Sequence, residues 1–112
     1  YEKTGIYPIN HTVVIRRELH ERHPWLALNL YHAFVAAKKD VEQQTRQTMN
    51  SYIETGLVPA ATEQALGADP KAYGMKASRN VVETIASYVH EQGLTDRKVG
   101  VEELFAASTL DI

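Results

Sequence analysis

His11 is the residue of this chain whose chemistry best suits catalysis. It follows a turn-rich segment containing Gly5, Pro8 and Asn10, and it precedes a run of β-branched residues. An imidazole at such a loop-to-strand junction can bind a carboxylate or transfer a proton near neutral pH. The structural alternative is a histidine that only satisfies backbone groups at the end of a strand.

Tyr73 and Arg79 are candidates for binding an acidic ligand. The guanidinium of Arg79 is a planar fork that matches a carboxylate, and the phenol of Tyr73 can donate a hydrogen bond or stack on an aromatic ring. In the alternative interpretation, Arg79 is a solvated residue in the first turn of a helix, and Tyr73 anchors a loop beside Gly74. These residue types permit a carboxylate-binding site without establishing one.

Other polar clusters do not match known metal or catalytic sites. His20 and His23 lie at i and i+3, whereas the helical zinc motif of metalloproteases places its histidines at i and i+4. Glu102 and Glu103 are adjacent, so on a helix their side chains do not face each other and should not share a proton; they suit the first turn of a helix. The sequence contains no Gly-rich phosphate loop and no Ser/His/Asp arrangement. We therefore expect neither a metal nor a cofactor.

The composition is that of one modest globular domain. The chain has 112 residues, 44% of them hydrophobic. No apolar run approaches the ~18 residues that a membrane span needs. The chain has 12 basic residues (lysine and arginine) and 14 acidic residues, which give a net charge of −2. This charge provides no general attraction to nucleic acid or to an anionic membrane. The absence of cysteine excludes disulfides, thiolate metal sites and cysteine nucleophiles.

One strand and several helices must position the candidate residues. Thr12–Ile15 is a continuous β-branched run, which predicts a short strand buried on both faces. Pro24 suits the first position of a long helix, and Thr45–Asn50 leaves open whether that helix is broken into two. We expect helices or helical turns over five segments, which are Arg17–Arg22, Trp25–Glu54, Pro59–Leu66, Ser78–Gly93 and Val101–Ala107.

Apolar residues recur at helical spacing in two of these segments. Gly56 and Gly93 are predicted to cap the two helices at their C-terminal ends. The pattern in the first helix is wide enough to predict burial on more than one side. Its residues are Leu26, Leu28, Leu30, Tyr31, Phe34, Val35, Ala37 and Val41, and those of the second helix are Val81, Val82, Ile85, Tyr88 and Val89.

The predicted strand has no partner within the chain. Backbone N–H and C=O groups of a buried strand need hydrogen-bond partners, so this strand must pair with a segment outside the chain or with a second copy. We therefore expect a mostly α-helical chain with one short strand, forming the C-terminal part of a longer α/β protein.

Three stretches of the chain together resemble the 4,5-dihydroxyphthalate decarboxylase family. They follow the order and spacing of that family across nearly the whole chain. They are Gly5–Arg17 with Glu21–Trp25, then Tyr73-Gly74 with Arg79, and finally His90–Leu94 with Val101–Phe105.

The resemblance implies a fold similar to the type II periplasmic binding proteins, which have two α/β lobes and a ligand cleft between them. Residues 1–16 would then form a crossover loop and the strand that returns to the first lobe. Residues 17–112 would form the helical C-terminal part of that lobe. The strand's partners and most of the cleft would lie in the preceding region of the same protein.

The resemblance also implies a function. The family removes one carboxylate from an aromatic dicarboxylate without oxidation, converting 4,5-dihydroxyphthalate to protocatechuate. By likeness His11 is the catalytic acid or carboxylate ligand, and the substrate-binding residues are Asn10, Tyr73 and Arg79. The ligand would be a small aromatic or carboxylate compound, and the enzyme would be cytoplasmic.

The family also has relatives that only bind and deliver ligands. The chain departs from the family at Lys71-Ala72 and Ser78, where members tend to have Trp-Pro and Asn. The alternative function is therefore the solute-binding component of an ABC-type transporter, located in the periplasm and without catalysis. We expect the isolated chain to self-associate through exposed apolar faces, with no nucleic-acid partner and no membrane insertion.

Overall fold

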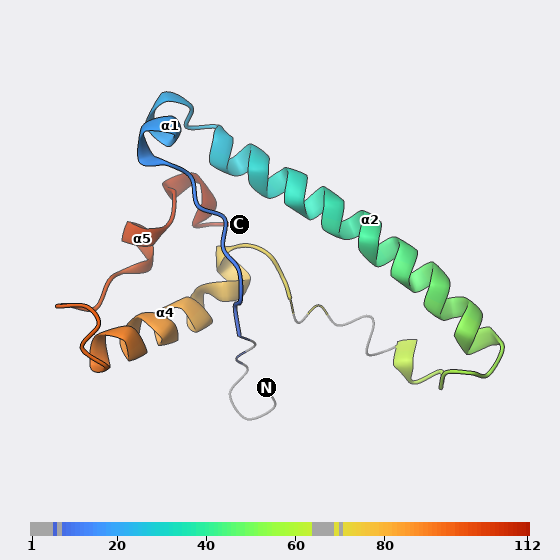
Figure 1. Ribbon diagram of the computed structural model, residues 1–112. Helices are drawn as coiled ribbons and strands as arrows, with labels where there is room; N and C mark the ends of the chain where they lie inside the picture. The colour runs from blue at the N-terminus through green and yellow to red at the C-terminus, as the bar shows by residue number, and fades with distance from the viewer. Residues whose placement is uncertain (1–5, 7, 64–68, 70) are drawn as a thin grey trace. The chain divides into compact units, whose positions relative to one another are not determined.

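The computed structural model describes residues 6, 8–63, 69 and 71–112 (Figure 1). The chain forms two compact units, which we name by their place in the sequence. The terminal unit contains Tyr1–Leu30 and Lys71–Ile112, and the middle unit contains Tyr31–Pro70. The elements are α1 (Arg17–Arg22), α2 (Leu26–Glu54), α4 (Met75–Glu91), α5 (Val101–Leu104) and the 3₁₀ helix η1 (Ala107–Thr109).

The mostly helical character predicted from the sequence is confirmed, but the predicted strand is not seen. Residues 8–16 belong to no helix or strand. Val13 is 60% exposed and Val14 is 87% exposed, so this run is not buried. The described part of the chain contains no strand at all, and thus no ladder on which Thr12–Ile15 could pair. β-branched side chains favour extended backbone, but a strand also requires a hydrogen-bonded neighbour.

The prediction that α1 spans Arg17–Arg22 is confirmed, whereas the start of α2 lies later than predicted. Pro24 does not occupy the first helical position. Pro24 and Trp25 instead form a turn, in which the amide of Leu26 donates to the carbonyl of His23 at 3.0 Å. The helix begins only after that turn, at Leu26.

α2 is one continuous helix, so the break considered at Thr45–Asn50 does not occur. The hydroxyl of Thr45 donates to the carbonyl of Val41 at 2.9 Å, and that of Thr48 donates to the carbonyl of Gln44 at 3.0 Å. Ser51 and Thr55 bond in the same way four residues back. Each hydroxyl thus finds a hydrogen-bond acceptor within the helix, and the helix continues without a break.

Both predicted glycine caps are confirmed, and each closes its helix with two backbone hydrogen bonds. At the end of α4, the amide of Gly93 donates to His90 at 2.9 Å and that of Leu94 donates to Val89 at 3.0 Å. The corresponding bonds close α2 at Gly56. The φ angles of Gly56 and Gly93 are 74° and 72°, which suit glycine because it has no Cβ.

The small core lies in the terminal unit. Among the described residues the buried apolar side chains are Ala27 of α2, Met75 and Val81 of α4, and Val101 of α5. The prediction that α2 is buried on more than one side is therefore wrong, since Phe34 is 47% exposed and Val41 is 62% exposed. An apolar stripe is buried only where another element covers it, and no described residue of the middle unit is buried.

α4 begins at Met75, three residues before the predicted cap at Ser78, and the preceding Gly74 marks the turn. Met75 is 4% exposed, so the first residue of α4 already packs into the core. The amide of Lys76 in this first turn donates to the carbonyl of Ile112 at 2.8 Å. That bond satisfies one of the amides that a helix start otherwise leaves unpaired.

The last predicted helix is shorter than expected. α5 ends at Leu104, because Phe105 and Ala106 adopt extended backbone conformations before η1 begins. The helix predicted over Pro59–Leu66 is helical at Thr62 and Glu63, and its remainder lies outside the described residues. None of the described helices has the length and apolarity to cross a membrane.

We expect Gly93→Ala to destabilise the protein by about 1 kcal/mol, because a Cβ disfavours the positive φ at this cap. Nothing lies within 4 Å of a Cβ built on Gly93, so the loss would come from the backbone alone. Gly93→Asn should lose less, since asparagine adopts this conformation more readily. Denaturant unfolding followed by circular dichroism measures both variants. Equal losses for alanine and asparagine would contradict the role assigned to φ.

Candidate functional site

α4 presents Arg79 at the surface of the terminal unit, one turn after the buried Met75. The Arg79 side chain is 41% exposed, so the aliphatic stem is partly covered while the guanidinium remains accessible. The prediction placed Arg79 in the first turn after a cap at Ser78. The earlier start of α4 instead places it further along the helix.

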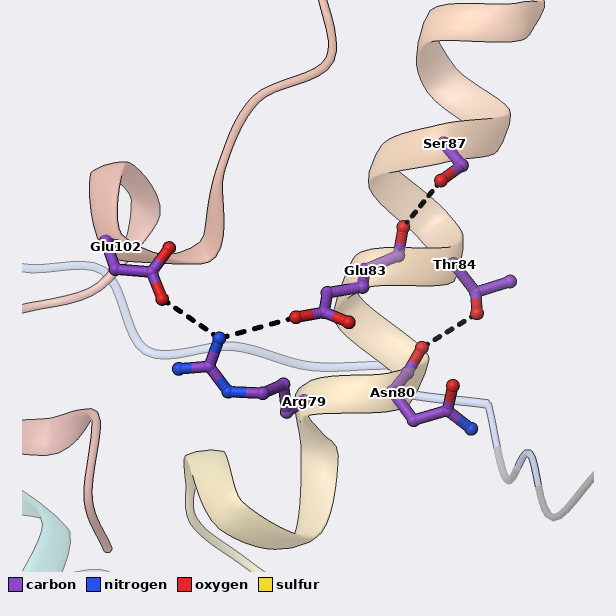
Figure 2. A network of polar contacts seen from close by, with 6 residues as sticks. All are labelled: Arg79, Asn80, Glu83, Thr84, Ser87 and Glu102. Carbon is purple, nitrogen blue, oxygen red and sulfur yellow. Dashed lines mark hydrogen bonds and ion pairs between the residues drawn. The ribbon is translucent and has the colours of Figure 1, made fainter.

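Two carboxylates bind the guanidinium of Arg79 (Figure 2). Nη1 donates to Glu102 Oε1 of α5 at 2.9 Å and to Glu83 Oε1 at 3.3 Å, one turn further along α4. The guanidinium thus connects α4 to α5 across a sequence separation of 23 residues. Its pKa is raised by the hydrogen bonds to Glu102 and Glu83, so Arg79 stays cationic.

The carboxyl of Glu102 stays ionised at neutral pH. Its pKa is lowered by a hydrogen bond from its own backbone amide and by the hydrogen bond from Arg79. The neighbouring Glu103 binds Arg97, at 2.8 Å to Nη1 and 2.6 Å to Nη2. The two adjacent glutamates therefore bind different arginines, as expected for neighbours on a helix that do not face each other.

Glu103 also caps the start of α5. Its Oε1 accepts a hydrogen bond from the amide of Gly100 at 3.0 Å. The bidentate contact with Arg97 and this amide together lower the pKa of Glu103 from 4.5 to about 2. Both partners favour the ionised carboxylate, which is why the pKa falls.

Asn10, His11 and Tyr73 belong to the same compact unit as Arg79. Asn10 and His11 are exposed in the extended segment before α1, and Tyr73 is 47% exposed just before Gly74. Within the part of the chain that the structure describes, neither Asn10 nor His11 makes a hydrogen bond or ion pair with Arg79. Asn10 and His11 thus share a compact unit with Arg79 but are not bonded to it in the described part of the chain.

The remaining histidines make local contacts. The rings of His23 and Trp25 lie edge to face with centroids 5.7 Å apart. The ring nitrogen Nδ1 of the exposed His90 lies 3.2 Å from the carbonyl of Thr95. Among the described residues, no group of three histidine, cysteine or acidic side chains is arranged to hold a metal ion.

The middle unit has its own charged contact. Lys38 Nζ lies 2.6 Å from Asp69 Oδ2 and 3.5 Å from Glu42 Oε1. Burial lowers the pKa of Lys38, but the hydrogen bond and charge of Asp69 outweigh that effect and leave it raised. The Lys38 side chain is only 17% exposed, so most of it is covered by its surroundings.

The two residues that fix Arg79, Glu83 and Glu102, are not among the predicted site residues. The spacing of Arg79 and Glu83 at i and i+4 on a predicted helix was a usable signal, since such residues lie on the same helix face. Glu102 had no comparable signal, because its partner lies on another element.

One sequence comparison gives a match over the whole chain. The chain is 29% identical over 114 aligned positions to a 4,5-dihydroxyphthalate decarboxylase from Comamonas testosteroni. The alignment covers 99% of this chain but 34% of that relative, so the chain spans about a third of the relative's length. No model of a protein family and no solved structure matches the chain. These findings support a distant relationship to that decarboxylase.

We expect the carboxyl of Glu103 to titrate at about pH 2 and not near 4.5. Because its pKa is lower in the folded chain, the stability that it contributes is complete above its ordinary value and is lost as the pH falls through about 2. Carbon-detected NMR of the Glu103 carboxyl measures the midpoint. Arg97→Gln should raise that midpoint, and Lys98→Gln should not. A midpoint near 4.5 in the unaltered protein would show that the ion pair does not form.

Proposed function

We propose that the protein containing this chain is a non-oxidative decarboxylase of an aromatic dicarboxylate, converting 4,5-dihydroxyphthalate to protocatechuate. The observation that carries this proposal is an alignment that covers 99% of the chain, at 29% identity. The aligned relative is named as a decarboxylase of this compound. The partly exposed Arg79 adds a group whose geometry suits a carboxylate.

We further propose that residues 1–16 and 17–112 belong to one lobe of a two-lobed fold similar to the type II periplasmic binding proteins. Val13 and Val14 are exposed, and β-branched side chains are more stable against apolar neighbours than in water. Their exposure supports a position of this segment against the remainder of such a fold.

The reaction needs a proton donor and an anion-binding group. Breaking the bond to the departing carboxylate leaves an electron pair on the ring carbon, and a proton must reach that carbon as carbon dioxide leaves. In our proposal the imidazolium form of His11 gives this proton to the ring carbon and becomes neutral imidazole. The His11 side chain is exposed in the segment before α1, so it is accessible to a ligand. Asn10, Tyr73 and Arg79 bind the carboxylates and ring hydroxyls.

We expect His11→Ala to lower kcat by about 100-fold or more, the usual loss when a general acid is removed. The Michaelis constant should change much less, because the proposed role is proton transfer. Protocatechuate formation by the whole protein measures both constants. His32→Ala is the matched control, since His32 is an exposed histidine of α2 that contacts Tyr31. Full activity in His11→Ala would remove His11 from the mechanism.

We expect Arg79→Gln to weaken binding of the substrate by roughly 10- to 100-fold, the usual effect of losing a charge-assisted hydrogen bond. Arg97→Gln is the control, because Arg97 also binds a glutamate of α5. The substrate-binding constant of the Arg97→Gln variant should stay close to that of the unaltered protein. Binding measured by calorimetry without any release of carbon dioxide would favour the solute-binding alternative over the enzyme.

A further inference from the structure

Arg79 has two carboxylate partners within the chain itself. Both reach the same nitrogen, Nη1, from Glu83 and Glu102 (Figure 2). Nε and Nη2 make no hydrogen bond to any residue in the part of the chain that the structure describes. The edge of the guanidinium that carries Nε and Nη2 is therefore not hydrogen-bonded within the described chain, although two carboxylates already outweigh the charge of Arg79.

The charges around Arg79 oppose the arrival of a further anion. One positive charge faces two negative charges at 2.9 and 3.3 Å, so the cluster is negative before a ligand binds. A dicarboxylate at the open edge would add two more negative charges around a single guanidinium. Because like charges repel at these distances, a bound ligand and one of the two glutamates should exclude each other.

Glu102 is the partner that can leave. Glu83 is fixed one turn away on the same helix as Arg79, whereas Glu102 reaches across from α5. The Glu102 side chain is 62% exposed, so turning it into solvent requires no change in the core. Its neighbour Val101 is 2% exposed, so α5 itself can stay in place during this rotation. Exposed ion pairs of this kind are weak.

We propose that Glu102 competes with the ligand's carboxylate for Arg79 and so determines which anions the site accepts. The identity of the ligand as an aromatic dicarboxylate rests on the proposed function. Because Glu102 is tethered beside Arg79, its effective concentration is high. A simple monocarboxylate gains little by replacing it. Two adjacent carboxylates on a ring offer more acceptor oxygens to the guanidinium and replace it more readily.

Calorimetry on the whole protein tests this competition with phthalate and benzoate as probes. Glu102→Gln should tighten phthalate binding about three- to tenfold, because it removes both the competitor and its charge. Benzoate binding should tighten more than phthalate binding, because the selection against monocarboxylates is lost with the Glu102 carboxylate. An equal gain for both ligands would overturn the role of Glu102 in selecting anions. Glu91→Gln is the matched control, since it removes the same charge at the far end of α4 and should change binding by less than about twofold.

A double variant shows whether the effect acts through Arg79. Adding Glu102→Gln to Arg79→Gln should give no gain over Arg79→Gln alone. The inference is overturned if Glu102→Gln leaves binding unchanged or weaker, if Glu91→Gln gives the same gain, if the gain survives without Arg79, or if phthalate binds to no variant.

Turnover of 4,5-dihydroxyphthalate, assayed separately, distinguishes this inference from the proposed function. If the predicted binding pattern is found without turnover, the proposal of decarboxylase activity is contradicted and the competition between Glu102 and the ligand is supported. If turnover is found but Glu102→Gln does not change binding, only the proposed competition is contradicted.

Discussion

The packing of α5 on α4 is the contact on which the candidate site depends. Val101 is the most buried of the four core side chains, and its burial fixes the first turn of α5 beside α4. Glu102 follows Val101 directly, so the same turn that enters the core places a carboxylate at Arg79. The apolar contact of Val101 therefore positions α5 on α4, and the ion pair between Arg79 and Glu102 forms as a consequence. An exposed ion pair alone is too weak to hold two elements together.

The features that were predictable from the sequence are those with local causes. Gly56 and Gly93 were identified as helix ends because a left-handed cap requires only a glycine at the right place. For the start of α4, the sequence predicts a cap at Ser78, because serine is a fair capping residue. In the structure Met75 begins the helix because it is buried in the core, and a buried side chain outweighs a weak local preference.

The features that could not be predicted depend on distant partners. Thr12–Ile15 has the composition of a strand, but no ladder exists for it in the described part of the chain. The stripe of α2 has the spacing of a buried face, yet spacing says nothing about whether another element covers that face. Arg79 was identified as an anion-binding candidate from its chemistry. Its engagement by Glu102 is a tertiary contact that no local pattern encodes.

The hydroxyl groups along α2 affect how that helix meets its surroundings. Thr45 and Thr48 donate to carbonyls of their own helix, which fixes their side-chain torsion angles and turns their polar atoms toward the backbone. With Val41 and Met49 they line a shallow hollow on this helix. Side chains that are already held in one rotamer lose little conformational entropy when another surface covers them. Contact with this part of α2 therefore carries a smaller ordering cost than contact with a surface of lysines and glutamates.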